Sequence, residues 1–344
     1  MTATYYKYIL NFKQPSGTSR GILTSKETWF IVLNENDKKG IGECAILKGL
    51  SVDDRPDYEA TLRWTCKNIS LGLEVLLHKL KEFPSIQFGL EMAFKSFESK
   101  KEFELFPSEF TRGNDSIPIN GLIWMGTEEF MKKQIKKKIE DGFKCLKLKI
   151  GAIDFKTELN LLKAVRKEYT SNDIELRVDA NGAYSPLEAL EKLKRLSDYN
   201  LHSIEQPIKT GQWQEMAKLC EQTPLPIALD EELIGVFDIE KKLELLQTIQ
   251  PHFIILKPSF VGGFAGSNDW IELAETNEIG LWITSALESN VGLNAISQWT
   301  YTLHNHLFQG LGTGGLFSNN FDSPLKVKNG TLHYDSSVNW NFNL

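Results

Sequence analysis

From residue 117 onward, the chain alternates between short apolar runs and longer stretches in which apolar positions follow a helical period. Short apolar runs bounded by turn residues predict strands, whereas apolar positions three and four residues apart predict helices. Amphipathic stretches at residues 128–142, 155–169 and 187–199 separate the runs. The runs predict strands at residues 117–124, 145–150, 174–178, 203–205, 226–229, 253–256, 281–284 and 308–311.

This alternation is typical of a parallel sheet, because parallel neighbours need a long crossover between them. About eight such units favour an α/β fold in which the sheet closes into a (β/α)8-type barrel. An open, doubly wound sheet would place a GxGxxG turn after an early strand, and the sequence has none there. The sequence therefore predicts a barrel.

Residues 1–112 show a different pattern and predict a separate α+β domain. Short aromatic and β-branched runs at residues 5–12, 28–33 and 40–44 indicate a small antiparallel sheet. Helical patterns follow at residues 57–68, 71–82 and 86–100. We expect the barrel to occupy residues 113–320, and the C-terminal segment, residues 321–344, to return to the N-terminal domain.

Composition narrows the class of partner. The chain has 344 residues, of which 41% are hydrophobic, and its net charge of −6 gives no support for a surface that binds nucleic acid or an anionic membrane. We therefore expect a small-molecule partner, and the oligomeric state stays open. The start of the chain lacks the pattern of a secretory signal, and no apolar stretch reaches the roughly 20 residues of a spanning helix, so we expect a cytoplasmic protein. Four cysteines without CxxC spacing predict neither a zinc site nor a disulfide framework.

Three acidic residues fall at the ends of successive predicted strands. Asp179, Glu205 and Asp230 lie about 25 residues apart, which is one strand–helix unit each. Because the C-terminal ends of barrel strands meet at the mouth of the barrel, these side chains should converge there. Three neighbouring carboxylates repel each other, and a hard divalent cation relieves that repulsion. The pattern predicts a Mg²⁺ site, in which Mn²⁺ could substitute.

Lysines occupy the neighbouring strand ends on both sides. Lys147 and Lys149 are two residues apart on one predicted strand, so both point to the same face. If that face is enclosed, burial and mutual repulsion should lower a lysine pKa and make a base of it. Lys257 ends the strand that follows Asp230. This arrangement suits removal of a proton next to a carboxylate, because Mg²⁺ can stabilise the resulting enediolate.

The motifs resemble the enolase superfamily, in its muconate-lactonising branch, over essentially the whole chain. The similar segments are KLKIG, RVDANGAY, SIEQP, IALDEEL, ILKPSFVGG and GLGTGG. The resemblance implies a modified (β/α)7β barrel with an N-terminal capping domain. It also implies Mg²⁺ ligands at the three acidic positions, with Asn181 and Glu231 supporting them. Lys149 would be the base, Lys147 would assist it, and Lys257 would stabilise the enediolate from the opposite face.

Within this branch, the resemblance implies a dehydratase of menaquinone biosynthesis. Its substrate is a small carboxylate, 2-succinyl-6-hydroxy-2,4-cyclohexadiene-1-carboxylate, which loses water by syn elimination. A dipeptide epimerase or N-acylamino acid racemase stays open as an alternative, because two lysines on opposite faces would serve a two-base proton transfer equally well. A barrel that binds a ligand without turnover is a more distant alternative.

Substrate contacts are expected from several further positions. Arg177 shares the parity of Asp179, so it should point inward, either as a site residue or as a salt-bridge partner of Asp179. Thr284 and Ser285 offer hydroxyls, and the turn with Gly312 and Thr313 offers backbone amides, for an anionic succinyl tail. No acidic DxD stands at residues 310–315 to bind an α-ammonium group, which disfavours a dipeptide. The resemblance further implies that a loop at residues 15–21, which includes Arg20, closes over the substrate.

Overall fold

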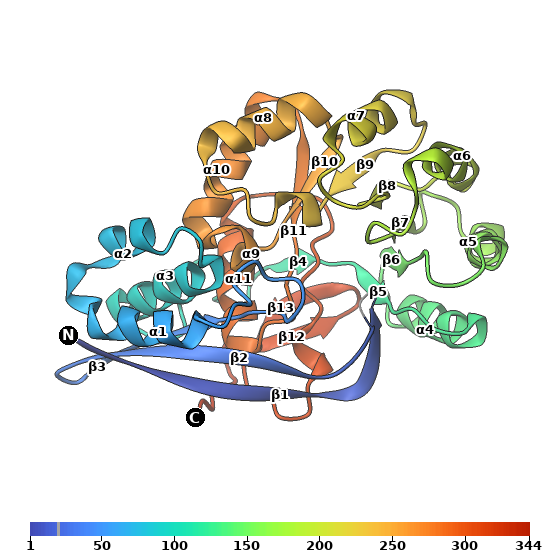
Figure 1. The fold of residues 1–344 in the computed structure, drawn as a ribbon. Helices are drawn as coiled ribbons and strands as arrows, with labels where there is room; N and C mark the ends of the chain where they lie inside the picture. Colours follow the sequence, from blue (N-terminus) through green and yellow to red (C-terminus); the bar gives the residue numbers. More distant parts are fainter. Residues whose placement is uncertain (19–20) are drawn as a thin grey trace.

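The computed structural model describes residues 1–18 and 21–344. Arg20 lies outside the described residues. Figure 1 shows an N-terminal layer of long strands with helices above it, next to a ring of short strands surrounded by helices. Among the described residues, no helix is long and apolar enough to cross a membrane.

The N-terminal domain is an antiparallel sheet covered by helices on one face, as the sequence predicts. Trp29, Ile31 and Leu33 alternate along the second strand and are buried against those helices. The strands pair in the order β1-β2-β3, and β1 runs to Thr18, so the described part of the expected loop is strand. The elements are β1 (Thr2–Thr18), β2 (Gly21–Glu35), β3 (Lys38–Cys44), α1 (Tyr58–Lys67), η1 (Ile69–Leu71), α2 (Leu73–Lys79) and α3 (Pro84–Glu98).

Helix α3 approaches strand β3 closely because glycines face it. A Cβ atom built on Gly42 would lie 1.8 Å from the carbonyl oxygen of Gly89. No side chain larger than hydrogen fits there, so this glycine fixes the distance between sheet and helix.

Seven parallel strands form the barrel sheet in the order β11-β10-β9-β8-β7-β6-β5. The layer between these strands and the surrounding helices is built from fully buried aliphatic residues such as Leu146, Val178 and Ile254. The strands are β5 (Gly121–Ile123), β6 (Cys145–Lys149), β7 (Glu175–Asp179), β8 (Ser203–Glu205), β9 (Ile227–Leu229), β10 (Phe253–Leu256) and β11 (Gly280–Ile283). The helices around them are α4 (Glu128–Glu140), α5 (Phe155–Glu168), α6 (Pro186–Ser197), α7 (Trp213–Gln222), η2 (Glu231–Leu233), α8 (Ile239–Ile249), α9 (Pro258–Val261), α10 (Gly263–Thr276), α11 (Asn290–Thr302) and η3 (Gly314–Leu316).

The first and last predicted strands differ from the expectation. The run at residues 117–124 divides into β4 (Ser116–Pro118), which pairs with the C-terminal strand β13, and β5, which pairs with β6. The run at residues 308–311 forms no full strand. Gln309 instead bridges Ile119, and Gly310 bridges Thr284, so this short segment joins the two edges of the sheet and closes the ring.

The C-terminal segment contacts both parts of the molecule. Strands β12 (Leu325–Lys328) and β13 (Thr331–Tyr334) pair with β4 in a small sheet. The rings of Phe321 and Phe342 pack on Phe30 of the N-terminal sheet, with centroids 5.4 and 5.5 Å away.

Glu91 joins the two domains by capping a barrel helix. This residue of α3 is buried, and its carboxylate accepts hydrogen bonds from the backbone N–H groups of Phe264 and Ala265 in the first turn of α10. Burial raises the pKa of Glu91 to about 7, although the two N–H donors oppose the rise. A helix N-terminus of the barrel therefore depends on a carboxyl group of the N-terminal domain.

This cap predicts a specific pH dependence of stability. Because the pKa of Glu91 is higher in the folded chain than in the unfolded one, the folded state binds more protons between about pH 4.5 and 7, and its stability falls as pH rises through that window. Across this window, the loss in free energy of unfolding is on the order of 3 kcal/mol. Urea unfolding at several pH values should show that Glu91→Gln flattens the profile, while Glu98→Gln, on the exposed face of α3, leaves it unchanged. Equal slopes in both variants would contradict this assignment.

Candidate active site

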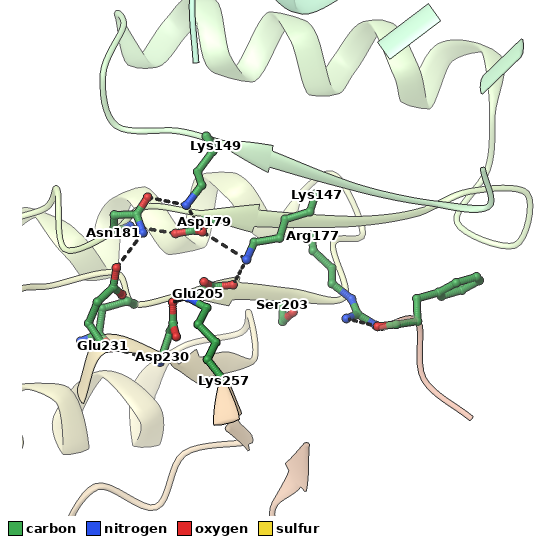
Figure 2. A network of polar contacts seen from close by, with 12 residues as sticks. Lys147, Lys149, Arg177, Asp179, Asn181, Ser203, Glu205, Asp230, Glu231 and Lys257 are labelled. Atoms are coloured by element: carbon green, nitrogen blue, oxygen red, sulfur yellow. Dashed lines mark hydrogen bonds and ion pairs between the residues drawn. The ribbon is translucent and has the colours of Figure 1, made fainter. Parts of the chain in front are cut away.

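The predicted acidic and basic residues meet at the C-terminal ends of five neighbouring strands. Lys147 and Lys149 lie on β6, Asp179 and Glu205 end β7 and β8, and Asp230 and Lys257 follow β9 and β10. The parallel register places Lys149 beside Asp179 and Asp179 beside Glu205. Figure 2 shows the carboxylates between the two β6 lysines on one side and Lys257 on the other.

Ion pairs connect these side chains into one network. Lys149 Nζ lies 2.6 Å from Asp179 Oδ2, and Lys147 Nζ lies 3.2 Å from the same oxygen and also contacts Glu205. Lys257 contacts Asp230 on the other side. The three carboxylates are almost completely buried. The network is therefore a desolvated cluster of alternating charge.

Burial and attraction between opposite charges shift the pKa of these lysines and aspartates in opposite directions. Burial lowers the pKa of Lys147, but attraction to Glu205 and Asp179 outweighs it, so that pKa lies above its ordinary value. The expectation of a lowered pKa is thus wrong for Lys147, because it counted lysine–lysine repulsion without the carboxylates. Burial raises the pKa of Asp179 and Asp230, yet the neighbouring lysines lower both overall.

Glu205 behaves differently from the other two carboxylates. Burial raises its pKa, and repulsion from Asp179 adds to the rise. Its buried Oε1 atom accepts no hydrogen bond from a described residue. Among the three carboxylates, Glu205 is therefore the one whose negative charge the neighbouring residues compensate least.

Asn181 and Glu231 form a second layer of this network and also line the cavity. Asn181 Oδ1 accepts a hydrogen bond of 2.8 Å from Lys149, and its Nδ2 donates to Glu231 Oε1 at 2.8 Å. Burial raises the pKa of Glu231, and repulsion from Asp230 adds to it. Asn181 thus holds Lys149 and Glu231 in fixed relative positions.

A cavity of about 440 Å³ lies between the capping domain and the barrel mouth. Lys147, Lys149 and Lys257 line it, as do four of the five residues expected to contact substrate. Those four are Thr284, Ser285, Gly312 and Thr313. The N-terminal domain contributes Lys13, Gln14, Pro15, Ser16, Leu23, Leu47, Lys48 and Leu50. Sequence reasoning pointed to Pro15 and Ser16, through the loop at residues 15–21. It missed the others, because nothing local distinguishes them from other surface residues.

The hydroxyl groups of Thr284 and Ser285, which line the cavity, differ in whether they can still donate a hydrogen bond to a ligand. Ser285 Oγ donates to Glu288 at 2.5 Å and accepts from Thr313 Oγ1 at 2.8 Å and from the backbone N–H of Leu287 at 3.1 Å. Ser285 therefore has no proton left to donate to a ligand. Thr284 Oγ1, by contrast, has no hydrogen-bond partner among the described residues.

Arg177 is not among the described residues that line the cavity. Its side chain points inward, as expected, but its Nε atom pairs with Glu175 at 2.7 Å and its Nη1 donates to the carbonyl oxygen of Phe308 at 2.9 Å. Its guanidinium also stacks on the ring of Trp282. The structure places Arg177 deeper in the barrel, where it holds the segment that closes the ring, and its side chain points away from Asp179 (Figure 2).

The cluster suits a hard cation in its donor chemistry. Within residues 1–18 and 21–344, no three His, Cys, Asp or Glu side chains surround one point closely enough to hold a metal as they stand. The carboxylates contact ammonium groups instead, so a cation could bind among them only if Lys147 and Lys257 withdraw. Three oxygen donors and the unsatisfied Glu205 Oε1 nevertheless match what Mg²⁺ requires.

Comparisons with known proteins match both parts of the chain. The model described as enolase C-terminal domain-like matches residues 130–337, and the model described as MenC, N-terminal domain, matches residues 1–97. An o-succinylbenzoate synthase from Desulfotalea psychrophila is 46% identical and aligns with 96% of this chain and 98% of its own length.

Solved structures of similar proteins agree with these sequence matches. The crystal structure of MenC from Desulfotalea psychrophila superposes with a TM-score of 0.86 at 43% identity, covering 97% of this chain and 99% of that one. A dipeptide epimerase from Enterococcus faecalis, in complex with Mg and a dipeptide, has a TM-score of 0.82 at 18% identity and covers 97% and 96% of the two chains. The second likeness shows the fold alone.

Proposed function

The chain belongs to the enolase C-terminal domain-like family, and from this premise we propose that it catalyses the o-succinylbenzoate synthase reaction. In that reaction, 2-succinyl-6-hydroxy-2,4-cyclohexadiene-1-carboxylate loses water by syn elimination to give o-succinylbenzoate, a step of menaquinone biosynthesis. The identity of 46% to a relative with this activity, over nearly the full length of both chains, supports the proposal.

The charge of the cavity wall is the observation that best supports this substrate. Six lysines line the cavity, and Glu231 is the single acidic residue among the described lining residues. The lysines are Lys13, Lys48, Lys138, Lys147, Lys149 and Lys257. The proposed substrate carries two carboxylates, one on the ring and one on the succinyl arm, so a cationic wall attracts it. A dipeptide would instead present an α-ammonium group to this wall.

One lysine carries out both proton transfers, and the other two supply positive charge. Lys149 takes the proton from the ring carbon next to the carboxylate, and the electron pair moves into the carboxylate as an enediolate. When the C–O bond breaks, Lys149 returns that proton to the departing hydroxide on the same face, and the ring becomes aromatic. Lys147 and Lys257 remain protonated and attract the developing negative charge.

Asp179, Glu205 and Asp230 would hold the Mg²⁺ ion, with Mn²⁺ as a substitute. When bound, this cation supplies positive charge that stabilises the enediolate more than the ground state. The buried position of the three carboxylates excludes water and strengthens that attraction. Asn181 orients Lys149 through its 2.8 Å hydrogen bond.

An ultraviolet assay tests the proposal. Purified protein with Mg²⁺ and the cyclohexadiene carboxylate should show loss of the diene absorbance as the aromatic product forms, and EDTA should stop the reaction. If no turnover occurs but α-protons of N-acylamino acids or dipeptides exchange in D₂O, the protein is a racemase or an epimerase. If neither reaction occurs, catalysis itself is ruled out and a ligand-binding role replaces it.

A further inference from the structure

Lys26 is a buried lysine at the junction of the two domains. It lies on β2, its exposed fraction is 3%, and its Nζ atom has no hydrogen-bond partner among the described residues. Lys26 shares a face of β2 with Thr28, whose Oγ1 atom donates to Glu43 of β3, and Glu43 also accepts from the backbone N–H of Ser289, the residue after Glu288. The charges of the two buried carboxylates, one from each domain, therefore act on Lys26, although the described residues show no direct ion pair with it. Burial lowers the pKa of Lys26, and these two carboxylates oppose that effect.

Glu43 attaches the N-terminal domain to a barrel helix. Its carboxylate accepts hydrogen bonds of 2.9 Å from the backbone N–H groups of Ser289 and Gly292, at the start of α11. It also accepts a hydrogen bond of 2.8 Å from Thr28 Oγ1, on the strand that carries Lys26. One face of the charge cluster is therefore rigidly bound to the barrel.

Glu288 fixes the cavity wall. Its Oε2 atom accepts from Ser285 Oγ at 2.5 Å and from the backbone N–H of Ala286 at 2.7 Å, and both residues line the cavity. Its Oε1 atom accepts from Ser259 Oγ at 2.7 Å, two residues after Lys257. A single carboxylate thus holds this part of the cavity wall together with the segment that follows Lys257.

Two buried carboxylates on either side of a junction would repel each other without a cation nearby. We propose that Lys26 is a positioning residue, whose positive charge offsets the repulsion between Glu43 and Glu288 and so keeps residues 285–288 in place as the wall that receives the succinyl arm. This inference rests on the proposed function for the identity of the ligand. It assigns a role in substrate recognition to a residue of the N-terminal domain that does not line the cavity.

Ligand binding with and without the succinyl arm tests the role. In isothermal titration of the Mg²⁺-loaded protein, Lys26→Met should raise the Kd for o-succinylbenzoate about tenfold and leave the Kd for benzoate within twofold. In the turnover assay, the same variant should raise KM more than it lowers kcat. Lys7→Met is the matched control, because Lys7 pairs with Glu27 on the exposed side of the same sheet. Equal binding of both ligands by both variants overturns the proposal.

A double-mutant cycle keeps the test decisive if Lys26→Met folds poorly. Lys26→Met combined with Glu288→Gln preserves the net charge of the cluster, so urea unfolding should show the double variant to be less destabilised than the sum of the single variants. Strict additivity contradicts the proposal. If the wild-type protein neither turns over the substrate nor binds o-succinylbenzoate, the proposed function fails, while the unfolding cycle still decides whether Lys26 couples to Glu288.

Discussion

Turnover should fall by about 10³-fold or more when Lys149 is replaced by alanine. Lys149 is the cavity lysine closest to Asp179 and is held by Asn181, and we propose it as the group that takes and returns the proton. Lys257→Ala should also reduce turnover, through lost charge stabilisation rather than a lost base. The ultraviolet assay at saturating Mg²⁺ measures both.

Chemical rescue separates a lost base from a disturbed fold. A small primary amine added to Lys149→Ala should restore part of the activity, because the deleted side chain leaves room in a cavity that already admits the substrate. Lys156→Ala, on the exposed surface of α5, serves as the control. Activity of Lys149→Ala within threefold of wild type would assign the base to another residue.

Glu205→Gln should weaken Mg²⁺ binding by about 100-fold and turnover with it. The substitution keeps the shape of the side chain and removes one of the three negative charges. Since Glu205 carries the buried oxygen that no described residue satisfies, its charge is the one that a cation would compensate most. Isothermal titration with Mg²⁺, or the electron paramagnetic resonance of Mn²⁺, measures the affinity independently of turnover.

Two comparisons complete this experiment. Glu188→Gln, on the exposed surface of α6, should bind Mg²⁺ like the wild type. Wild-type protein that retains full turnover in EDTA, or a Glu205→Gln variant with unchanged Mg²⁺ affinity, would remove the three carboxylates from the role of metal ligands.

The positions of Asp179, Glu205 and Asp230 could be predicted because one period governs them. Each lies at the C-terminal end of its own short strand. A parallel barrel brings these equivalent strand ends together, whatever residues the helices between them contain. The same argument placed Lys147 and Lys149 on one face. These predictions needed only the side-chain alternation of a strand and the length of the repeating unit.

Other features depend on long-range contacts that no local pattern encodes. The segment at residues 308–311 reads as a strand, but Gly310 lies so close to Thr284 that a Cβ atom would meet that side chain, and only single bridges form. Arg177 has inward parity, as predicted, yet Glu175 and the carbonyl of Phe308 bind it below the site. The hydrogen bond that Ser285 Oγ donates to Glu288 likewise depends on the fold, and no sequence motif predicts it.

The way in which the ring closes has a consequence for synthesis of the chain. Ile119 and Gln309 are joined across almost the whole barrel sequence, so β5 and β11 keep open hydrogen-bonding edges until residue 310 has left the ribosome. Unpaired edges of this kind recruit other strands. We therefore expect the nascent barrel to be more prone to aggregation before residue 310 emerges than after it, and chaperones that shield strand edges to act on it in that interval.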